Sequence, residues 1–299
     1  MRLIKQKFTK DSLATLLLLL PAIILVGYFV YYAISWNFVV SVSNWQGLSP
    51  NYSFGGFGQY EKLFRDPVFL QSLTNNLILI AIFVPGSLLV GLFLALLLDQ
   101  KVRKEGVFRT IYLLPFTLSF VVTAYLWMWM FNLENGVLNY LLGFFNIFGL
   151  NLQSAWISDP NIALICVVIA LIWQFSGYTM LIILAGIKSI PVSHIMAAEV
   201  DGASGFYLYR RVVIPQLKTS LSTAFVILVI FALKAFDFIY ILTGGGPGYA
   251  TEILPLTMYE VSFGTTNFPY GSAIATILFL LVMVIVVPYL YKTYRGKEK

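Results

Sequence analysis

Six long apolar stretches divide this sequence, and they constrain its fold more than any other feature. They lie at roughly residues 13–35, 72–98, 109–131, 160–186, 219–242 and 271–294. A helix needs about 20 predominantly apolar residues to cross a bilayer, and each stretch reaches this length. The composition agrees, because 59% of the residues are hydrophobic and only 11% are charged. The sequence therefore predicts an all-α integral membrane protein with six transmembrane helices, forming a single domain over residues 1–299.

The basic residues indicate how these helices are oriented. All but three of the 19 Lys and Arg residues flank one side of the predicted spans, and the exceptions are Lys62, Arg65 and Lys234. Cytoplasmic loops are enriched in Lys and Arg. Both termini are therefore predicted to be cytoplasmic, in a chain that crosses the plasma or inner membrane several times. The net charge of +6 is a topology signal and not a nucleic-acid-binding surface.

The first apolar stretch is predicted to stay in the protein as a membrane anchor. It is longer than the apolar region of a secretory signal peptide, and YYAISWNFVV at residues 31–40 offers no clear cleavage site with small residues.

The scarcity of reactive side chains excludes several classes of function. The chain has one cysteine, Cys166, and one histidine, His194. Together they cannot supply a disulfide, a zinc site or the clustered groups of a membrane-embedded enzyme. No G-x-x-x-x-G-K-[ST] motif is present, because TGGGPG at residues 243–248 lacks the lysine that contacts phosphate. We therefore expect no catalytic residue and no metal, and a tight external turn at residues 243–248.

The polar segment between the fourth and fifth spans, residues 187–218, is the longest predicted cytoplasmic feature. Gly202 can adopt the left-handed conformation that ends a helix, and Ser204 can cap a second helix. Pro215 disfavours helical geometry at Ile214. The segment is therefore predicted to form a helix-turn-helix at the membrane surface. Read from periodicity alone, it is a hairpin that merely connects two spans.

The residues of this hairpin resemble the cytoplasmic EAA loop of permeases from binding-protein-dependent ABC importers. In that loop Glu-Ala-Ala is followed by a glycine four residues after the second alanine and later by an aliphatic-x-aliphatic-Pro ending. The residues in register are Ala197, Ala198, Gly202, Val212, Ile214 and Pro215. EVDGAS matches the form usual in the carbohydrate-type branch, whereas Met196 replaces the glutamate of the motif. The resemblance implies that the hairpin docks on an ATPase through Ala197, Ala198, Glu199, Asp201, Gly202, Ala203 and Pro215.

Other segments resemble the same branch, which includes the maltose and glycerol-3-phosphate permeases, in the same order. They are FGQYEKLFRDPVF (57–69), FRTIYLLPF (108–116), WISDP (156–160), IWQFSGYTMLIILAGIKSIP (172–191) and FDFIYILTGGGPGYATE (236–252). The resemblance covers nearly the whole chain and implies the methionine-importer-like ABC permease fold. It also implies a subunit that transports a sugar or related solute without cofactors of its own. The implied partners are a second permease subunit, two ATPase subunits that bind ATP and Mg, and an extracytoplasmic solute-binding protein.

Two ionisable residues lie inside the fifth predicted span, where a charge is costly and commonly functional. Lys234 and Asp237 are three residues apart and are expected on neighbouring faces of one helix. They either pair with each other to fix helix packing or line the path of the substrate. In the resemblance, Lys234 matches a substrate-contacting position of the maltose-importer permease. A secondary transporter that uses the pair as a proton relay is the alternative function, and the coupling-loop match argues against it.

Aromatic and amide side chains of the third and fourth spans complete the predicted substrate path. Trp173, Gln174 and Tyr178 would supply the aromatic faces and hydrogen-bonding groups that sugars require. Phe116 and Phe120 match cavity positions of the family. Ordinary helix packing is the alternative explanation for both sets.

Overall fold

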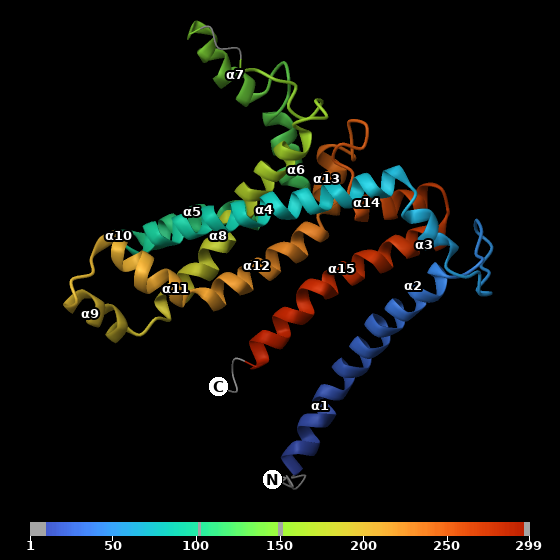
Figure 1. Ribbon diagram of the computed structural model, residues 1–299, viewed down its shortest axis with the longest axis horizontal. Helices are drawn as coiled ribbons and strands as arrows, with labels where there is room; N and C mark the ends of the chain where they lie inside the picture. The colour runs from blue at the N-terminus through green and yellow to red at the C-terminus, as the bar shows by residue number, and fades with distance from the viewer. Residues whose placement is uncertain (1–9, 101–102, 149–151, 296–299) are drawn as a thin grey trace. The chain divides into compact units, whose positions relative to one another are not determined.

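The structure is a computed structural model that describes residues 10–100, 103–148 and 152–295, most of which are helical (Figure 1). The predicted all-α architecture is confirmed. The helices are α1 (Lys10–Val26), α2 (Ala33–Ser41), α3 (Gly58–Leu63), α4 (Pro67–Asp99), α5 (Glu105–Thr117), α6 (Phe120–Met130), α7 (Val137–Gly143), α8 (Ala163–Lys188), α9 (Val192–Val200), α10 (Gly205–Leu208), α11 (Ile214–Gln216), α12 (Lys218–Leu233), α13 (Phe236–Leu242), α14 (Leu254–Tyr259) and α15 (Phe268–Arg295).

Four helical segments of the described chain are long and apolar enough to cross a membrane. They are Leu17–Ser41, Pro67–Asp99, Ala163–Lys188 and Phe268–Tyr291. Two helix pairs meet the same criterion together but are bent, by 93° between α5 and α6 and by 67° between Gly205–Gln216 and α12. The described residues thus hold four spans, or up to six if each bent pair is one span. The six predicted spans are compatible with this count, although the third is sharply broken.

The break between α5 and α6 follows from the local sequence. Pro115 lies in the last turn of α5, where it removes a backbone donor. Leu118 and Ser119 then adopt extended backbone conformations, with ψ of 145° and 152°. The hydroxyl of Ser119 caps α6 by accepting a hydrogen bond from the backbone N–H of Val122 at 3.3 Å. The chain therefore turns without leaving the start of α6 uncapped.

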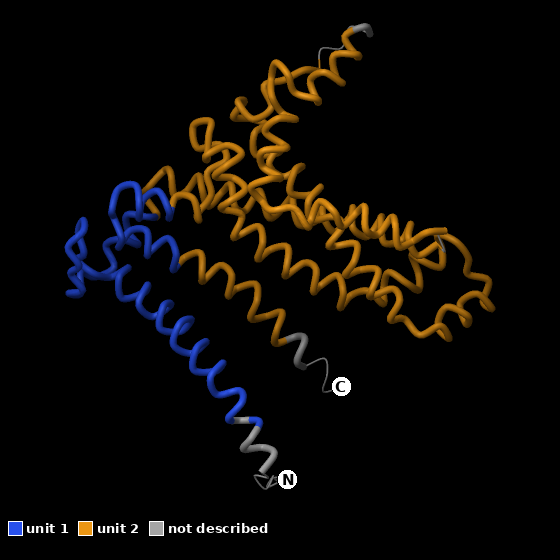
Figure 2. Tube along the Cα trace, turned by 180° about the vertical axis from the view of Figure 1, so that it is seen from behind, with its two compact units in different colours: residues 1–63, 258–276 blue, residues 64–257, 277–299 orange. Residues whose placement is uncertain are grey.

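The chain forms two compact units, coloured separately in Figure 2. Unit 1 comprises Met1–Leu63 and Met258–Thr276, and unit 2 comprises Phe64–Thr257 and Ile277–Lys299. The single functional domain expected over residues 1–299 stays a prediction.

In unit 1, polar side chains join α2 to its neighbours. Asn37 donates hydrogen bonds to the carbonyl oxygen of Ser272 and to the hydroxyl of Thr276, both at 3.1 Å. The hydroxyls of Ser41 and Tyr60 lie 2.7 Å apart. In the most apolar part of Leu17–Ser41, by contrast, no residue is buried. Such an apolar surface suits contact with lipid or with another membrane subunit.

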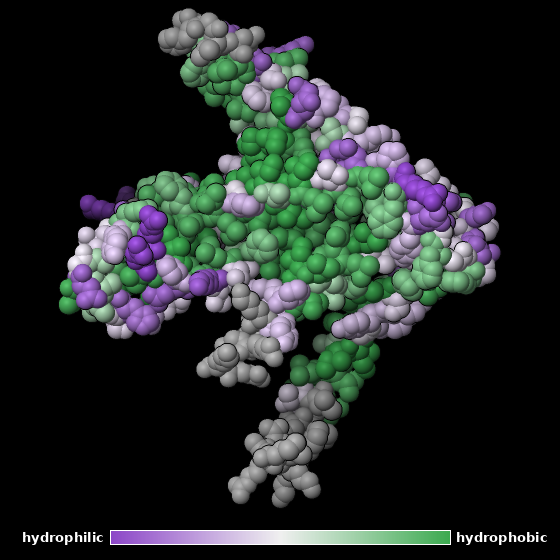
Figure 3. Space-filling model, in the orientation of Figure 1, coloured by the Kyte–Doolittle hydropathy of each residue, from purple (hydrophilic) through white to green (hydrophobic). Residues whose placement is uncertain are grey.

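In unit 2, the long helices α4 and α8 pack against each other, and α12 and α5 pack on them. The main core cluster includes Phe83, Phe175, Leu228 and Phe238, all of which are buried. Helix α5 approaches α8 closely at Gly177, where an added Cβ would clash with the carbonyl oxygen of Tyr112. Small residues permit such close backbone approach between membrane helices. On the face shown in Figure 3, hydrophobic residues dominate the long helices and hydrophilic residues gather over α9 and α10.

The glycine-rich segment after α13 forms the tight turn predicted for it. Gly244, Gly245 and Gly248 all have positive φ values, between 55° and 83°. Two asparagines of α4 hold the end of this turn. Asn75 donates to the carbonyl oxygen of Glu252 at 2.8 Å, and Asn76 accepts from the N–H of Leu254 at 2.8 Å.

Candidate functional site

A cavity of about 380 Å³ lies in unit 2 beside the break between α5 and α6. Its walls come from that break and from α5, α6, α8, α12 and α13. The lining residues are Phe116, Leu118, Ser119, Phe120, Val121, Gln174, Phe175, Phe231 and Asp237. The cavity therefore sits where the chain leaves regular helical structure, as binding sites formed by broken membrane helices do.

Aromatic rings form most of the apolar wall of this cavity. The ring of Phe175 lies 5.6 Å from Phe116, 6.0 Å from Phe120 and 4.7 Å from Phe231, measured between centroids. Contacts of this kind hold the four rings in fixed positions, since edge-to-face and offset arrangements are favourable. The result is a rigid aromatic surface suited to the C–H faces of a ring-shaped solute.

Gln174 supplies the buried polar group of the cavity. Its side chain is only 2% exposed. Its Nε2 donates a hydrogen bond to the carbonyl oxygen of Leu118 at 3.2 Å, whereas its buried Oε1 has no hydrogen-bond partner. A buried acceptor without a partner is costly. A solute hydroxyl that donates to this oxygen would remove that cost.

The structure brings four of the seven predicted path residues to the cavity, namely Phe116, Phe120, Gln174 and Asp237. Tyr178 lies behind the wall, with its ring stacked on Phe116 at 4.4 Å. Trp173 does not line the cavity and instead contacts Trp127, with centroids 5.8 Å apart.

The expectation that Lys234 and Asp237 lie on one continuous helix is wrong. Helix α12 ends at Leu233, Lys234 and Ala235 leave helical geometry, and α13 begins at Phe236. Both charged side chains are exposed in this chain. No hydrogen bond or ion pair joins them in the described structure, and Lys234 does not line the cavity. Lys234 therefore lies in the break itself, whereas Asp237 lies in the first turn of α13.

Sequence reasoning missed five cavity residues: Leu118, Ser119, Val121, Phe175 and Phe231. Pro115 followed by Ser119 is a helix stop and a helix cap in succession, which is a signal for the break. Phe175 and Phe231 carry no such signal, because an apolar residue in a membrane span is equally suited to lipid or core.

The predicted coupling hairpin is formed by α9, a turn and α10. The N–H of Gly202 donates to the carbonyl oxygen of Glu199 at 3.0 Å, and the N–H of Ala203 donates to that of Ala198 at 2.9 Å. Gly202 has a φ of +84°. These bonds form a Schellman motif in which Gly202 is the left-handed residue, and this confirms the helix end predicted from the glycine. Ala197, Glu199 and Asp201 are exposed, Ala198 is half-buried and Ala203 is buried.

The second half of the hairpin differs from expectation at Pro215. Ile214 is helical, with φ −57° and ψ −42°, and a π turn over Tyr209–Val213 leads into α11, which contains Pro215. The wider π spacing accommodates the missing N–H of proline, while Val213 and Leu217 are anchored in a buried cluster. Ser204 does occupy the cap position, but its side chain makes no capping hydrogen bond.

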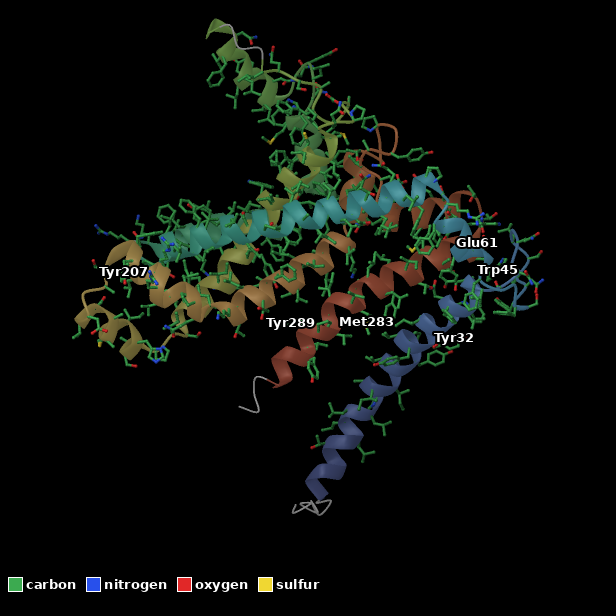
Figure 4. The ribbon with its side chains drawn as sticks, in the orientation of Figure 1. Tyr32, Trp45, Glu61, Tyr207, Met283 and Tyr289 are labelled. Atoms are coloured by element: carbon green, nitrogen blue, oxygen red, sulfur yellow. The ribbon has the colours of Figure 1, made fainter. Side chains whose placement is uncertain are left out.

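The hairpin presents an apolar patch of Val192, Met196, Val200, Phe206 and Tyr207, exposed by 59% to 87%. Tyr207, labelled in Figure 4, lies under the guanidinium of Arg211, which is 5.9 Å from its ring centroid. The hairpin therefore exposes several large apolar side chains, one of them beside a basic residue, a composition typical of protein interfaces.

Two polar contacts lie where the hairpin meets the helices of unit 2, and one of them joins the hairpin to α4. The hydroxyl of Tyr209 donates to Oδ2 of Asp99, at the end of α4, over 2.8 Å. Lys188, at the end of α8, forms an ion pair with Glu105 of α5. Burial and the adjacent carboxylate of Asp99 raise the pKa of Tyr209 to about 12. The tyrosine therefore keeps its proton, and so its role as donor, at neutral pH.

Comparison with known proteins identifies the family of the chain. The model of the family described as binding-protein-dependent transport system inner membrane component matches residues 87–295. A probable ABC transporter permease of Pyrococcus horikoshii is 59% identical over 95% of this chain and 97% of its own length. The xylose/arabinose import permease of Haloferax volcanii is 43% identical, over 91% and 85%. The trehalose/maltose permease of Thermococcus litoralis is 31% identical, over 96% and 95%.

A solved structure gives the same fold. The crystal structure of a bacterial ABC transporter involved in alginate import contains a chain with a TM-score of 0.81 to this one. The match covers 96% of each chain at 22% sequence identity. The fold and the family resemblance expected from the sequence are thus confirmed.

The family assignment also decides between the classes of function considered for the sequence. Members of this family are transport subunits of ABC importers, in which separate subunits hydrolyse ATP. An ion-gradient-driven transporter finds no support in these relatives. The chain belongs to the family of binding-protein-dependent transport system inner membrane components.

Proposed function

We propose that this chain is the permease subunit that carries a sugar, or a related hydroxylated solute, through an ATP-driven importer. The observation that carries this proposal is the cavity, which is lined by four phenylalanine rings and by Gln174, whose buried Oε1 has no hydrogen-bond partner. Sugars offer hydroxyl donors around a ring and C–H groups on its faces, and the cavity offers a partner for each. Relatives named for xylose and arabinose, for trehalose and maltose, and for lactose support this class of solute.

Phe116, Phe120 and Gln174 contact the solute, and Tyr178 supports Phe116 from behind. Asp237 lies at the cavity wall and accepts hydrogen bonds from solute hydroxyls. Lys234 and Asp237 are both exposed in the isolated chain although they follow an apolar helix. A charge in a membrane span needs a polar neighbour, so a second permease subunit covers this surface and completes the path. Trp173 does not line the cavity of this chain, so it belongs to the path only where the second permease subunit completes it.

The hairpin couples this path to ATP hydrolysis. Its apolar patch and the turn at Gly202 dock on one of two ATPase subunits, and these subunits bind ATP and Mg²⁺. The same contact surface includes Ala197, Ala198, Glu199, Asp201, Ala203 and Pro215. Met196 adds apolar area, being 59% exposed, in place of a carboxylate. Both termini and the hairpin are then cytoplasmic, and an extracytoplasmic binding protein delivers the solute. One relative in fold, the alginate transporter, was crystallised with a periplasmic protein that holds an alginate pentasaccharide.

The test is reconstitution of the chain with its partner permease, ATPase and binding protein in liposomes. Uptake of labelled pentoses and disaccharides is then measured with ATP, with a non-hydrolysable analogue, and with a proton or sodium gradient alone. We expect uptake of at least one sugar that requires both ATP and the binding protein. Uptake driven by an ion gradient without ATP would overturn the proposal.

A further inference from the structure

Tyr209 joins two parts of unit 2 that are 110 residues apart in sequence. It is the first residue of the π turn in the hairpin, and its hydroxyl donates to the Asp99 carboxylate that ends α4, over 2.8 Å. A hydrogen bond to a charged acceptor is shorter and stronger than one between neutral groups. Both residues are half-buried, so water competes less for this bond than at an exposed site.

Apolar packing fixes the tyrosine ring in this place. The ring contacts a cluster of buried residues in which Ala95 and Leu98 come from α4, Ile183 and Ile187 from α8, and Val213 from the π turn. The hydroxyl is thus held at a fixed distance from α4 by its own ring. A π turn in a helix commonly marks a functional position, and here it carries this side chain.

Helix α4 leads from this contact to the cavity. It packs along α8 through much of its length, and α8 carries Gln174 and Phe175 in the cavity wall. The ion pair between Lys188 and Glu105 joins the end of α8 to the start of α5 and involves no residue of the hairpin helices. The contact with Asp99 is therefore the polar connection, in the described residues, between the hairpin and α4.

We propose that Tyr209 is a positioning residue that transmits movement of the hairpin to α4 through its hydrogen bond with Asp99. This inference rests on the proposed docking of the hairpin on an ATPase. When the ATPase moves the hairpin, the bond makes α4, and with it α8 and the cavity wall, follow. Without the bond the hairpin moves on the ATPase while the spans lag behind, so ATP is hydrolysed without import.

The test compares Tyr209→Phe with the wild type in the reconstituted complex. Two quantities are measured together, namely hydrolysis stimulated by the binding protein and the number of solute molecules imported per ATP. We expect stimulated hydrolysis to stay within about twofold, and solute imported per ATP to fall about tenfold, as the loss of a charge-assisted hydrogen bond predicts. Tyr125→Phe is the matched control, because this exposed tyrosine of α6 lies outside the hairpin and does not line the cavity. It should leave both quantities unchanged.

Substitutions at Asp99 separate the hydrogen bond from general destabilisation. Asp99→Asn keeps an acceptor and should retain more coupling than Asp99→Leu. The double variant Tyr209→Phe with Asp99→Leu should couple no worse than the poorer single variant, because both remove one bond. Unchanged import per ATP in Tyr209→Phe, or a proportional loss of hydrolysis and import, would overturn the inference. The variant Gly202→Val tests separately whether the hairpin docks on the ATPase. If the hairpin does not dock there, Gly202→Val leaves stimulated hydrolysis intact.

Discussion

The side-chain Nε2 of Gln174 donates a hydrogen bond to the carbonyl oxygen of Leu118 at 3.2 Å, joining the middle of α8 to the break between α5 and α6. The carbonyl at Leu118 is available because the backbone there is extended and leaves the helix. This bond fixes the amide plane and so holds Oε1 of the same side chain buried without a partner. The broken helix and the proposed solute contact thus depend on one glutamine.

Replacing Gln174 by Leu should raise the KM for solute uptake about 10-fold or more, because it removes an acceptor and leaves the Leu118 carbonyl unpaired. Initial rates of ATP-dependent uptake in liposomes measure this change. Ser176→Ala on the same helix is the control, since that hydroxyl bonds to its own helix at the carbonyl of Trp173 and lies outside the cavity lining. An unchanged KM for Gln174→Leu would mean that the glutamine only closes the helix break.

Lys234 and Asp237 do not pair in this chain, so their substitutions should have separate effects. Lys234→Met and Asp237→Asn should each lower the rate of uptake while assembly with the ATPase is unchanged. In the double variant the two losses should add in free energy, since no bond joins the two groups. Lys62→Met, at an exposed lysine of unit 1, is the control. Recovery of uptake in the double variant would instead indicate a self-neutralising pair.

Gly177 should tolerate no side chain, because a Cβ there meets the backbone carbonyl of Tyr112 and not a movable side chain. Gly177→Ala should force α5 away from α8 and destabilise the fold by about 1–3 kcal/mol. Thermal unfolding of the purified protein in detergent measures the effect as a lower Tm. Gly106→Ala is the matched control, since nothing lies within 4 Å of its Cβ position and alanine favours helix. Equal Tm values for the two variants would contradict the close packing.

The sequence was sufficient to predict features that depend on residue type alone. Apolar length marked the membrane segments, although it did not distinguish a straight span from the 93° bend after Pro115. Glycine at position 202 predicted a left-handed helix end, because other residues pay a steric penalty there. The cavity was only half predicted. Gln174 and Asp237 stand out as polar residues in apolar stretches, whereas Phe175 and Phe231 have the same composition as lipid-facing residues.

Two local rules failed where tertiary packing outweighed them. The helix break at Lys234 has no glycine or proline beside it, and it occurs between Leu233 and Phe238, which are both buried in the main cluster. Packing on each side of the break sets the geometry that the local sequence does not. At Pro215 the steric preference against helix at the preceding residue is smaller than the packing energy of Val213 and Leu217. Neither the helix break at Lys234 nor the helical geometry before Pro215 can be predicted from the spacing of residues in the sequence.

Membrane orientation is checked by labelling single cysteines after Cys166, which is buried, has been replaced by alanine. Cysteines at the exposed positions Asn51 and Asn135 should react with a membrane-impermeant maleimide in intact cells. A cysteine at Ser204 should react only after the membrane is opened, because the basic residues place the hairpin inside. Labelling of Ser204 in intact cells would reverse the proposed topology.

Substitutions at Gly202 test the docking of the hairpin on the ATPase separately from the transmission of its movement to α4. A valine at φ +84° costs about 1–2 kcal/mol in backbone strain, and the empty space around its Cβ position leaves conformation as the only obstacle. Gly202→Val should therefore redirect α10 and abolish stimulated ATP hydrolysis and uptake together, unlike Tyr209→Phe. Gly202→Asn should fall between glycine and valine, since asparagine tolerates the left-handed region.

Two measurements make this last prediction specific. Disulfide cross-linking to the ATPase from a cysteine at Ala198 should weaken in Gly202→Val, because that residue lies in the turn held by the Gly202 conformation. Gly106→Val, at an open helical position with ordinary φ, controls for the added side chain and should keep hydrolysis and cross-linking. Full stimulated hydrolysis in Gly202→Val would show that the hairpin is a connector between spans, since a coupling element must hold its two helices at a fixed angle to enter the ATPase.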